Sequence, residues 1–90
     1  MTSHREIKLI NKLGLHARAA AKLVQLTSQF KSKIIMTKND QPVDAKSIMG
    51  VMMLAATCGT SVALEATGED AEAALDAIED MFNDRFGEDA

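Results

Sequence analysis

The sequence predicts an α+β fold in which three helices cover one face of a four-stranded, mostly antiparallel sheet. Four short segments alternate between apolar and polar residues as strands do, and three segments have the apolar spacing of helices. Their order is strand, helix, strand, strand, helix, strand, helix. Such elements pack as two layers, because each helix has one apolar face to bury. The 90 residues contain no linker or repeat, so we expect one domain over residues 1–90.

The first strand and the first helix are separated by a short break. Residues Glu6–Ile10 alternate, with Ile7 and Leu9 on one face and Lys8 on the other. A helix is expected over Ala17–Ser28, because its apolar residues recur at helical spacing and its alanines favour a helix. The residues expected on its buried face are Ala20, Leu23, Val24 and Thr27.

The next two strands form a predicted hairpin. Lys33–Lys38 and Pro42–Ala45 both alternate, and the Asn39-Asp40 pair between them is typical of a tight turn. Proline cannot donate a hydrogen bond to a neighbouring strand, so we expect the second strand at the edge of the sheet.

A second helix, from Ile48 to about Ala55, follows Ser47, whose hydroxyl can cap its first turn. This helix is apolar nearly all round, and a short helix in a small domain cannot bury every face. We therefore expect an exposed partner-docking patch formed by Ile48, Met49, Met52 and Met53. The alternative is that methionines fill gaps in the core, which we expect for one or two of them, as for Val51 and Leu54.

The last strand and helix complete the pattern. Val62, Leu64 and Ala66 alternate with Ala63 and Glu65 until Gly68 breaks the strand. The helix that follows is predicted to end at Gly87, with Arg85 in its last turn. Acidic residues that suit its positive start are Glu69, Asp70 and Glu72. Its periodic face is formed by Ala74, Ala77, Ile78, Met81, Phe82 and Arg85.

Composition argues against several functions. No apolar run is long enough to cross a bilayer and no apolar signal segment follows the N-terminus, so we expect a cytoplasmic protein without membrane insertion. The single cysteine, Cys58, fits a reducing compartment and provides no Cys-x-x-Cys metal pair. A net charge of −3 and only three aromatic residues, all Phe, argue against nucleic-acid binding. We expect no cofactor and no metal.

Charge is distributed unevenly along the chain. Residues 1–46 hold nine Lys or Arg and three acidic residues, a net +6, whereas residues 47–90 hold one Arg and ten acidic residues, a net −9. The basic half contains His16 and would suit an acidic partner. Alternatively, the acidic residues simply form the solvated face of the last helix.

The residues that carry chemistry lie in Gly14-Leu15-His16-Ala17-Arg18-Ala19-Ala20, where a strand-like stretch changes to helix. The first amides of a helix have no partners within it and form an anion site. The positive helix start also favours a neutral, nucleophilic imidazole at His16, and Arg18 adds a cation suited to a phosphoryl group. His16 can therefore accept and pass on a phosphoryl group. The alternative is that it is a helix cap or an ordinary surface residue.

Two stretches of the chain resemble known motifs. Gly14-Leu15-His16-Ala17-Arg18 resembles the phosphohistidine motif of the HPr family, the small phosphocarriers of the bacterial phosphotransferase system. Lys46-Ser47-Ile48-Met49-Gly50-Val51-Met52 resembles the regulatory serine segment of that family. The resemblance covers nearly the whole chain and implies an HPr-like open-faced β-sandwich that is monomeric.

The resemblance also implies a function. Enzyme I would transfer a phosphoryl group from phosphoenolpyruvate to the pros nitrogen (Nδ1) of His16, and His16 would donate it to an EIIA protein. Arg18 would be the charge partner, and the amides of Ala17, Arg18 and Ala19 would cradle the phosphate. The chain would be a carrier and not an enzyme, since no second acid or base is evidently paired with His16. Ser47 matches the serine phosphorylated by HPr kinase/phosphorylase, although it can equally be a plain helix cap.

Two departures from the family pattern matter. Ala19 stands where the family usually has proline, which puts the rigidity of the helix start and the transfer rate in doubt. Asn11-Lys12-Leu13-Gly14 looks more like the proteobacterial and nitrogen-type branch than the enteric sugar-transport form. An alternative function is a regulatory interaction module that uses Ser47 and the methionine-rich helix without phosphoryl relay.

Overall fold

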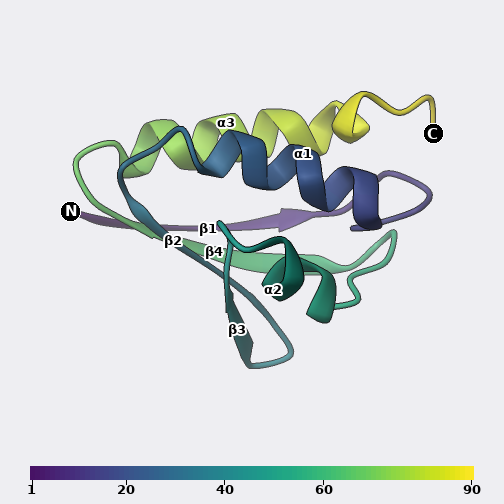
Figure 1. Cartoon of the computed structure of the whole chain (residues 1–90), viewed down its shortest axis with the longest axis horizontal. Coiled ribbons are helices and arrows are strands. Elements are labelled where there is room, and N and C mark those ends of the chain that lie inside the picture. Colours follow the sequence, from purple (N-terminus) through teal and green to yellow (C-terminus); the bar gives the residue numbers. More distant parts are fainter.

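Four antiparallel strands form one sheet in the order β1-β4-β2-β3 (Figure 1). The computed structural model describes all residues 1–90. The strands are β1 (Thr2–Lys8), β2 (Lys33–Lys38), β3 (Gln41–Asp44) and β4 (Ser61–Thr67). β4 and β2 lie in the centre, and β1 and β3 form the two edges. The predicted antiparallel sheet is confirmed.

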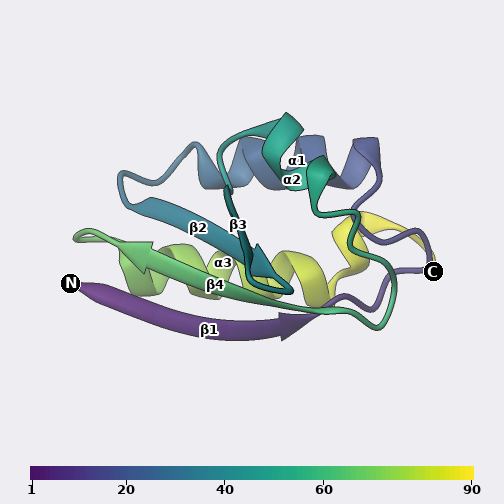
Figure 2. The ribbon, with the colours of Figure 1, turned by 90° about the horizontal axis from the view of Figure 1, so that it is seen from below.

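Three helices complete the predicted βαββαβα order. They are α1 (Ala17–Thr27), α2 (Ile48–Met53) and α3 (Ala71–Asn83), and a 3₁₀ turn follows at Arg85–Gly87. Figures 1 and 2 show α1 and α3 side by side on one face of the sheet, whereas the short α2 packs against α1 and β3. None of these helices combines the length and apolar character that a bilayer span requires.

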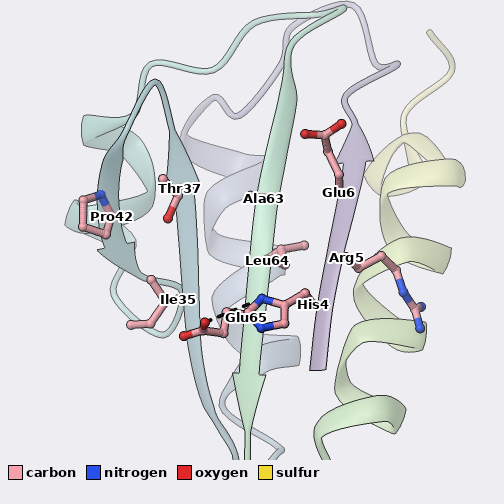
Figure 3. A pocket seen from close by; sticks show the side chains of 9 residues that line it. All are labelled: His4, Arg5, Glu6, Ile35, Thr37, Pro42, Ala63, Leu64 and Glu65. Atoms are coloured by element: carbon pink, nitrogen blue, oxygen red, sulfur yellow. Dashed lines mark ion pairs between the residues drawn. The ribbon is translucent and has the colours of Figure 1, made fainter. Parts of the chain in front are cut away.

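Successive side chains of β4 point to opposite faces of the sheet, one buried under the helices and one open to solvent. Val62, Leu64 and Ala66 point into the core beneath the helices, as predicted. On the open face, a shallow hollow of about 600 Å³ contains the ion pair between His4 Nδ1 and Glu65 Oε2, 3.6 Å apart (Figure 3). None of the predicted site residues lines this hollow.

The first strand begins and ends earlier than predicted. β1 spans Thr2–Lys8 rather than residues 6–10, and it pairs with β4 along its whole length. Its early inward positions include Ser3, which is 8% exposed, and Arg5, so apolar alternation could not reveal them. The Arg5 guanidinium instead contacts three carboxylates of α3: Asp76 at 2.7 Å, Glu79 at 3.0 Å and Glu72 at 3.1 Å.

The predicted hairpin is confirmed with small changes at its ends. β2 has the predicted bounds, and Asn39 and Asp40 both adopt positive φ (50° and 65°), as a type I′ turn requires. β3 spans Gln41–Asp44, one residue earlier than predicted, and lies at the sheet edge as its proline indicated.

The end of the last helix differs from the prediction. α3 stops at Asn83, and Arg85, expected in its last turn, adopts a φ of 54° beyond it. The chain turns there because Phe86 returns to the core, where it is 2% exposed and its ring centroid lies 5.1 Å from that of Phe82. This turn places the C-terminal residues Glu88, Asp89 and Ala90 near the start of α1, where they line a pocket with His16 and Arg18.

Asp70 precedes α3 but makes no side-chain cap. Its carboxylate accepts hydrogen bonds from the Lys31 amide at 2.8 Å, from the Ser32 amide at 2.9 Å and from the Ser32 hydroxyl. Asp70 thus ties the α1–β2 connection to the start of α3. These bonds, the one from the Ser32 hydroxyl above all, lower the pKa of Asp70.

Candidate functional site

Gly14 brings the loop between β1 and α1 against the loop before β4. Its φ is 62°, and a Cβ at this position would lie 2.5 Å from the carbonyl oxygen of Ala56 and 2.8 Å from Thr57 Cα. The next residue completes the contact, since the Leu15 amide donates to the Ala56 carbonyl at 3.0 Å. Only glycine fits this close approach without strain. The backbone before His16 is therefore held by the rest of the fold.

His16 is the N-cap residue of α1, with extended backbone (φ −72°, ψ 175°) and no capping bond from its side chain. Its carbonyl accepts from the Ala20 amide at 2.8 Å, whereas the amides of Ala17, Arg18 and Ala19 donate to no backbone acceptor. These three amides are the free donors of the helix start, and the helix dipole adds to their positive potential. Unpartnered donors therefore follow His16 directly in the chain, although Ala19 itself is fully buried.

Arg18 lies on the same pocket as His16. The pocket has a volume of about 570 Å³ and is lined by Lys12, Leu13, His16, Arg18, Glu88, Asp89 and Ala90. The Arg18 side chain is exposed and forms no ion pair with any carboxylate of the chain. A free guanidinium beside unpaired amides is suited to bind the oxygens of a phosphoryl group.

The structure adds Glu88 to the site, a residue that the sequence reasoning missed. Glu88 Oε2 contacts Nε2 of His16, and Glu88 Oε1 accepts from Asn11 Nδ2 at 3.0 Å. The expectation that no acidic or basic residue is paired with His16 is therefore wrong. Glu88 lies 72 residues further along the chain, beyond the last helix, where no motif or periodicity marked it.

Asn11 supports this arrangement from inside the protein. It is fully buried, and its Nδ2 donates to the Gly14 carbonyl at 2.8 Å as well as to Glu88. Its Oδ1 is buried without a hydrogen-bond partner. Burial alone would raise the pKa of Glu88, but the hydrogen bonds from Asn11 and His16, together with the nearby charge of Lys22, outweigh it and lower this pKa. Glu88 therefore faces His16 as a carboxylate.

Ser47 and the predicted docking patch lie on a neighbouring element. The Ser47 hydroxyl caps α2 by accepting from the Gly50 amide at 3.1 Å, and α2 packs against α1. Val51 and Leu54 are buried as predicted. The exposed fractions of the patch residues are 43% for Ile48, 72% for Met49, 41% for Met52 and 65% for Met53. The expectation that one or two of these methionines fill the core is wrong.

Comparisons with known proteins agree with these features. The family model described as "PTS HPr component phosphorylation site" matches residues 3–84. The phosphocarrier protein HPr of Cupriavidus necator is 56% identical over 84 residues, which cover 93% of this chain and 94% of that protein. The HPr of Neisseria meningitidis is 55% identical over the same shares of both chains.

Solved structures agree as well. The crystal structure of HPr from Thermoanaerobacter tengcongensis superposes with a TM-score of 0.94 at 44% identity, over 98% of this chain and 99% of that one. The match thus covers the sheet, the helices and the loop that carries His16. The chain belongs to the HPr family, the phosphocarrier proteins of the phosphotransferase system.

Proposed function

We propose that His16 accepts a phosphoryl group from enzyme I on Nδ1 and donates it to the histidine of an EIIA protein. The observation that carries this proposal is the position of the imidazole: it stands at the start of α1, beside three amides without backbone partners and a guanidinium without an acidic partner. Phosphoryl transfer depends mainly on positioning and on electrostatic stabilisation, and these groups provide both.

The choice of nitrogen follows from the hydrogen bonds of the ring. Glu88 contacts Nε2, so Nδ1 is the nitrogen left for an incoming phosphorus atom. The phosphoryl oxygens would then be held by the amides of Ala17, Arg18 and Ala19 and by the Arg18 guanidinium. The chain is consumed and regenerated once per transfer, which makes it a stoichiometric carrier rather than an enzyme.

Incubation with enzyme I and phosphoenolpyruvate tests the proposal. Intact mass spectrometry should detect one acid-labile phosphate on the wild type and none on His16→Ala. Arg18→Gln should lower the transfer rate by about tenfold, since a charge-assisted contact is lost, whereas Lys33→Gln, which removes an exposed charge from β2, should not. No phosphate on the wild type, with an enzyme I that phosphorylates another carrier, would refute the proposal.

We also propose that Ser47 is a site of regulatory phosphorylation by an HPr kinase/phosphorylase and that the α2 patch docks partners. A phosphate at Ser47 would lie at a helix start, where negative charge is favourable, and would add charge beside the exposed Ile48 and Met49. Met49→Glu should therefore raise the KM of enzyme I for the carrier. Ala63→Glu, on the open face of the sheet, is the matched control.

A second candidate function is a regulatory module that acts through Ser47 and the α2 patch without phosphoryl relay. Ala19 favours it, because the family proline that would fix the start of α1 is absent. Phosphorylation of His16 without transfer to any EIIA would support this alternative. Transfer to an EIIA at a rate similar to that of an HPr with proline would exclude it.

We also propose to which branch of the family the chain belongs, and in which oligomeric state and cellular compartment it acts. Asn11-Lys12-Leu13-Gly14 supports a proteobacterial, nitrogen-type role over sugar transport, which predicts faster transfer to a nitrogen-type EIIA than to a sugar-specific one. We infer a monomer with one domain over residues 1–90. The exposed thiol of Cys58 is compatible with a reducing cytoplasm as the compartment in which it acts.

A further inference from the structure

The carboxylate of Glu88 is held in place from two sides. One oxygen contacts Nε2 of His16, and the other accepts from the buried Asn11. The Glu88 side chain is only 16% exposed, and that of His16 is 27% exposed. Because Asn11 also donates to the Gly14 carbonyl at 2.8 Å, one amide group links the loop before His16 to the residue that contacts its ring.

The C-terminal segment that carries Glu88 is anchored in the fold. Phe86 is buried against Phe82, and its carbonyl accepts from Lys22 Nζ at 2.6 Å. The Glu88 amide donates to the Arg85 carbonyl at 2.9 Å, within the turn that follows α3. These contacts limit where the Glu88 carboxylate can lie, so its position against His16 is set by the core and not by a free chain end.

We propose that Glu88 is a positioning residue for phosphoryl transfer: it holds His16 in the tautomer with hydrogen on Nε2 and balances the positive charge of the phosphorylated ring. The tautomer of a histidine is set by the hydrogen bond that one nitrogen makes, and a carboxylate at Nε2 selects Nε2–H. The lone pair is then on Nδ1, on the residue that directly precedes the unpartnered amides of α1. This inference deepens the proposed function and rests on it.

The transfer step balances without any proton transfer by Glu88. The Nδ1 lone pair forms a bond to phosphorus while the bond between phosphorus and the donor's leaving group breaks, and that electron pair stays with the donor. The proton remains on Nε2, so the phosphorylated ring carries a positive charge that the adjacent carboxylate stabilises. In the donation step, a nitrogen lone pair of the acceptor histidine forms a bond to phosphorus while the electron pair of the Nδ1–P bond returns to Nδ1, and the ring of His16 is again neutral with its proton on Nε2.

The test compares Glu88→Gln with Asp84→Asn. Each variant removes one negative charge near the C-terminus, but the Asp84 side chain is exposed and makes no contact with His16. Nitrogen-15 NMR of the imidazole should show Nε2–H in the wild type and in Asp84→Asn, and a mixture of tautomers in Glu88→Gln, whose amide can also donate. The rate of transfer to Glu88→Gln should fall by about tenfold, as expected for the loss of a hydrogen bond to a charged group.

A chain that ends at Gly87 with an amidated C-terminus provides a second variant, because it removes the Glu88 carboxylate without creating a new terminal one and leaves the Phe86 anchor in place. It should reproduce the Glu88→Gln tautomer mixture and slow transfer. Equal rates in Glu88→Gln and Asp84→Asn, or faster transfer without the carboxylate, would overturn the inference. The tautomer measurement needs no phosphoryl donor, whereas a wild-type chain that takes up no phosphate refutes the proposed function, so the two failures are distinguishable.

Discussion

Replacing Gly14 with alanine would put a methyl group where the backbone of Ala56 and Thr57 already lies. The added Cβ would be 2.5 Å from the Ala56 carbonyl oxygen and 2.8 Å from Thr57 Cα. Neither is the flexible end of a side chain, so the loop before β4 must shift. Gly59 is the matched control, because its φ is also positive (90°) but a Cβ there would meet no atom within 4 Å.

The two variants share one energy term and differ in another. A left-handed alanine costs about 1–2 kcal/mol. Part of this is offset, because alanine reduces the entropy of the unfolded chain by about 0.4–1 kcal/mol relative to glycine. Gly59→Ala should therefore lower the free energy of unfolding by about 1 kcal/mol or less. Gly14→Ala adds an overpacking cost of about 1–3 kcal/mol, for a total near 3 kcal/mol.

Urea unfolding followed by circular dichroism measures the difference, since the chain has no Trp or Tyr for fluorescence. Gly14→Ala should also slow phosphoryl transfer, because the clash pushes the loop before β4 away from the loop that carries Gly14 and His16. Equal losses of stability in the two variants would show that conformation alone sets the cost. That result would refute the conclusion that the close contact with Ala56 places His16.

Other substitutions test the remaining interactions. Ser47→Ala should destabilise the protein by about 1 kcal/mol in urea unfolding through loss of the α2 cap, whereas Ser47→Asp, which keeps an acceptor, should not. The pKa of Asp70 lies below its ordinary value of 3.8 in the folded protein, so its ionised form stabilises the fold above that value, and the contribution is lost as the pH falls through the folded-state pKa. Asp70→Asn should accordingly have a lower free energy of unfolding than the wild type at neutral pH. Urea unfolding at a series of falling pH values should show this difference shrinking. Arg5→Met should cost about 1 kcal/mol, and the loss should shrink in about 1 M salt, because three carboxylates of α3 surround this guanidinium. A loss that is independent of salt would show that the aliphatic stem of Arg5, and not its charge, stabilises β1 against α3.

Periodicity predicted the elements whose buried positions are apolar. β2 and β4 are central strands with clear alternation, and both were found where it indicated. β1 was misplaced because its early inward positions hold Ser3 and Arg5, and Arg5 is satisfied by carboxylates some 70 residues away in sequence. A polar residue that is paired across the fold leaves no local signal.

The candidate site likewise has one part that the sequence predicted and one part that it did not. His16 and Arg18 belong to a continuous local motif, and the free amides follow from the place where α1 begins, so the sequence predicted this half. Glu88 and Asn11 meet only because Phe86 turns the chain back into the core after α3. The positive φ of Arg85, at a position where a helical pattern continued, could not be read from the residue types.

The charges of the two halves of the sequence did not indicate which charged groups pair with each other in the folded protein. Three acidic residues of α3 surround Arg5, so the acidic half is partly neutralised by the basic half inside the same molecule. Arg18, by contrast, has no carboxylate partner, and the carboxylate nearest to His16 already accepts hydrogen bonds from Asn11 and the ring. The positive potential at the start of α1 is therefore left for an external anion, although the net charge of the chain is −3. Binding of a phosphoryl group here depends on which acidic residues are already paired and not on the overall charge.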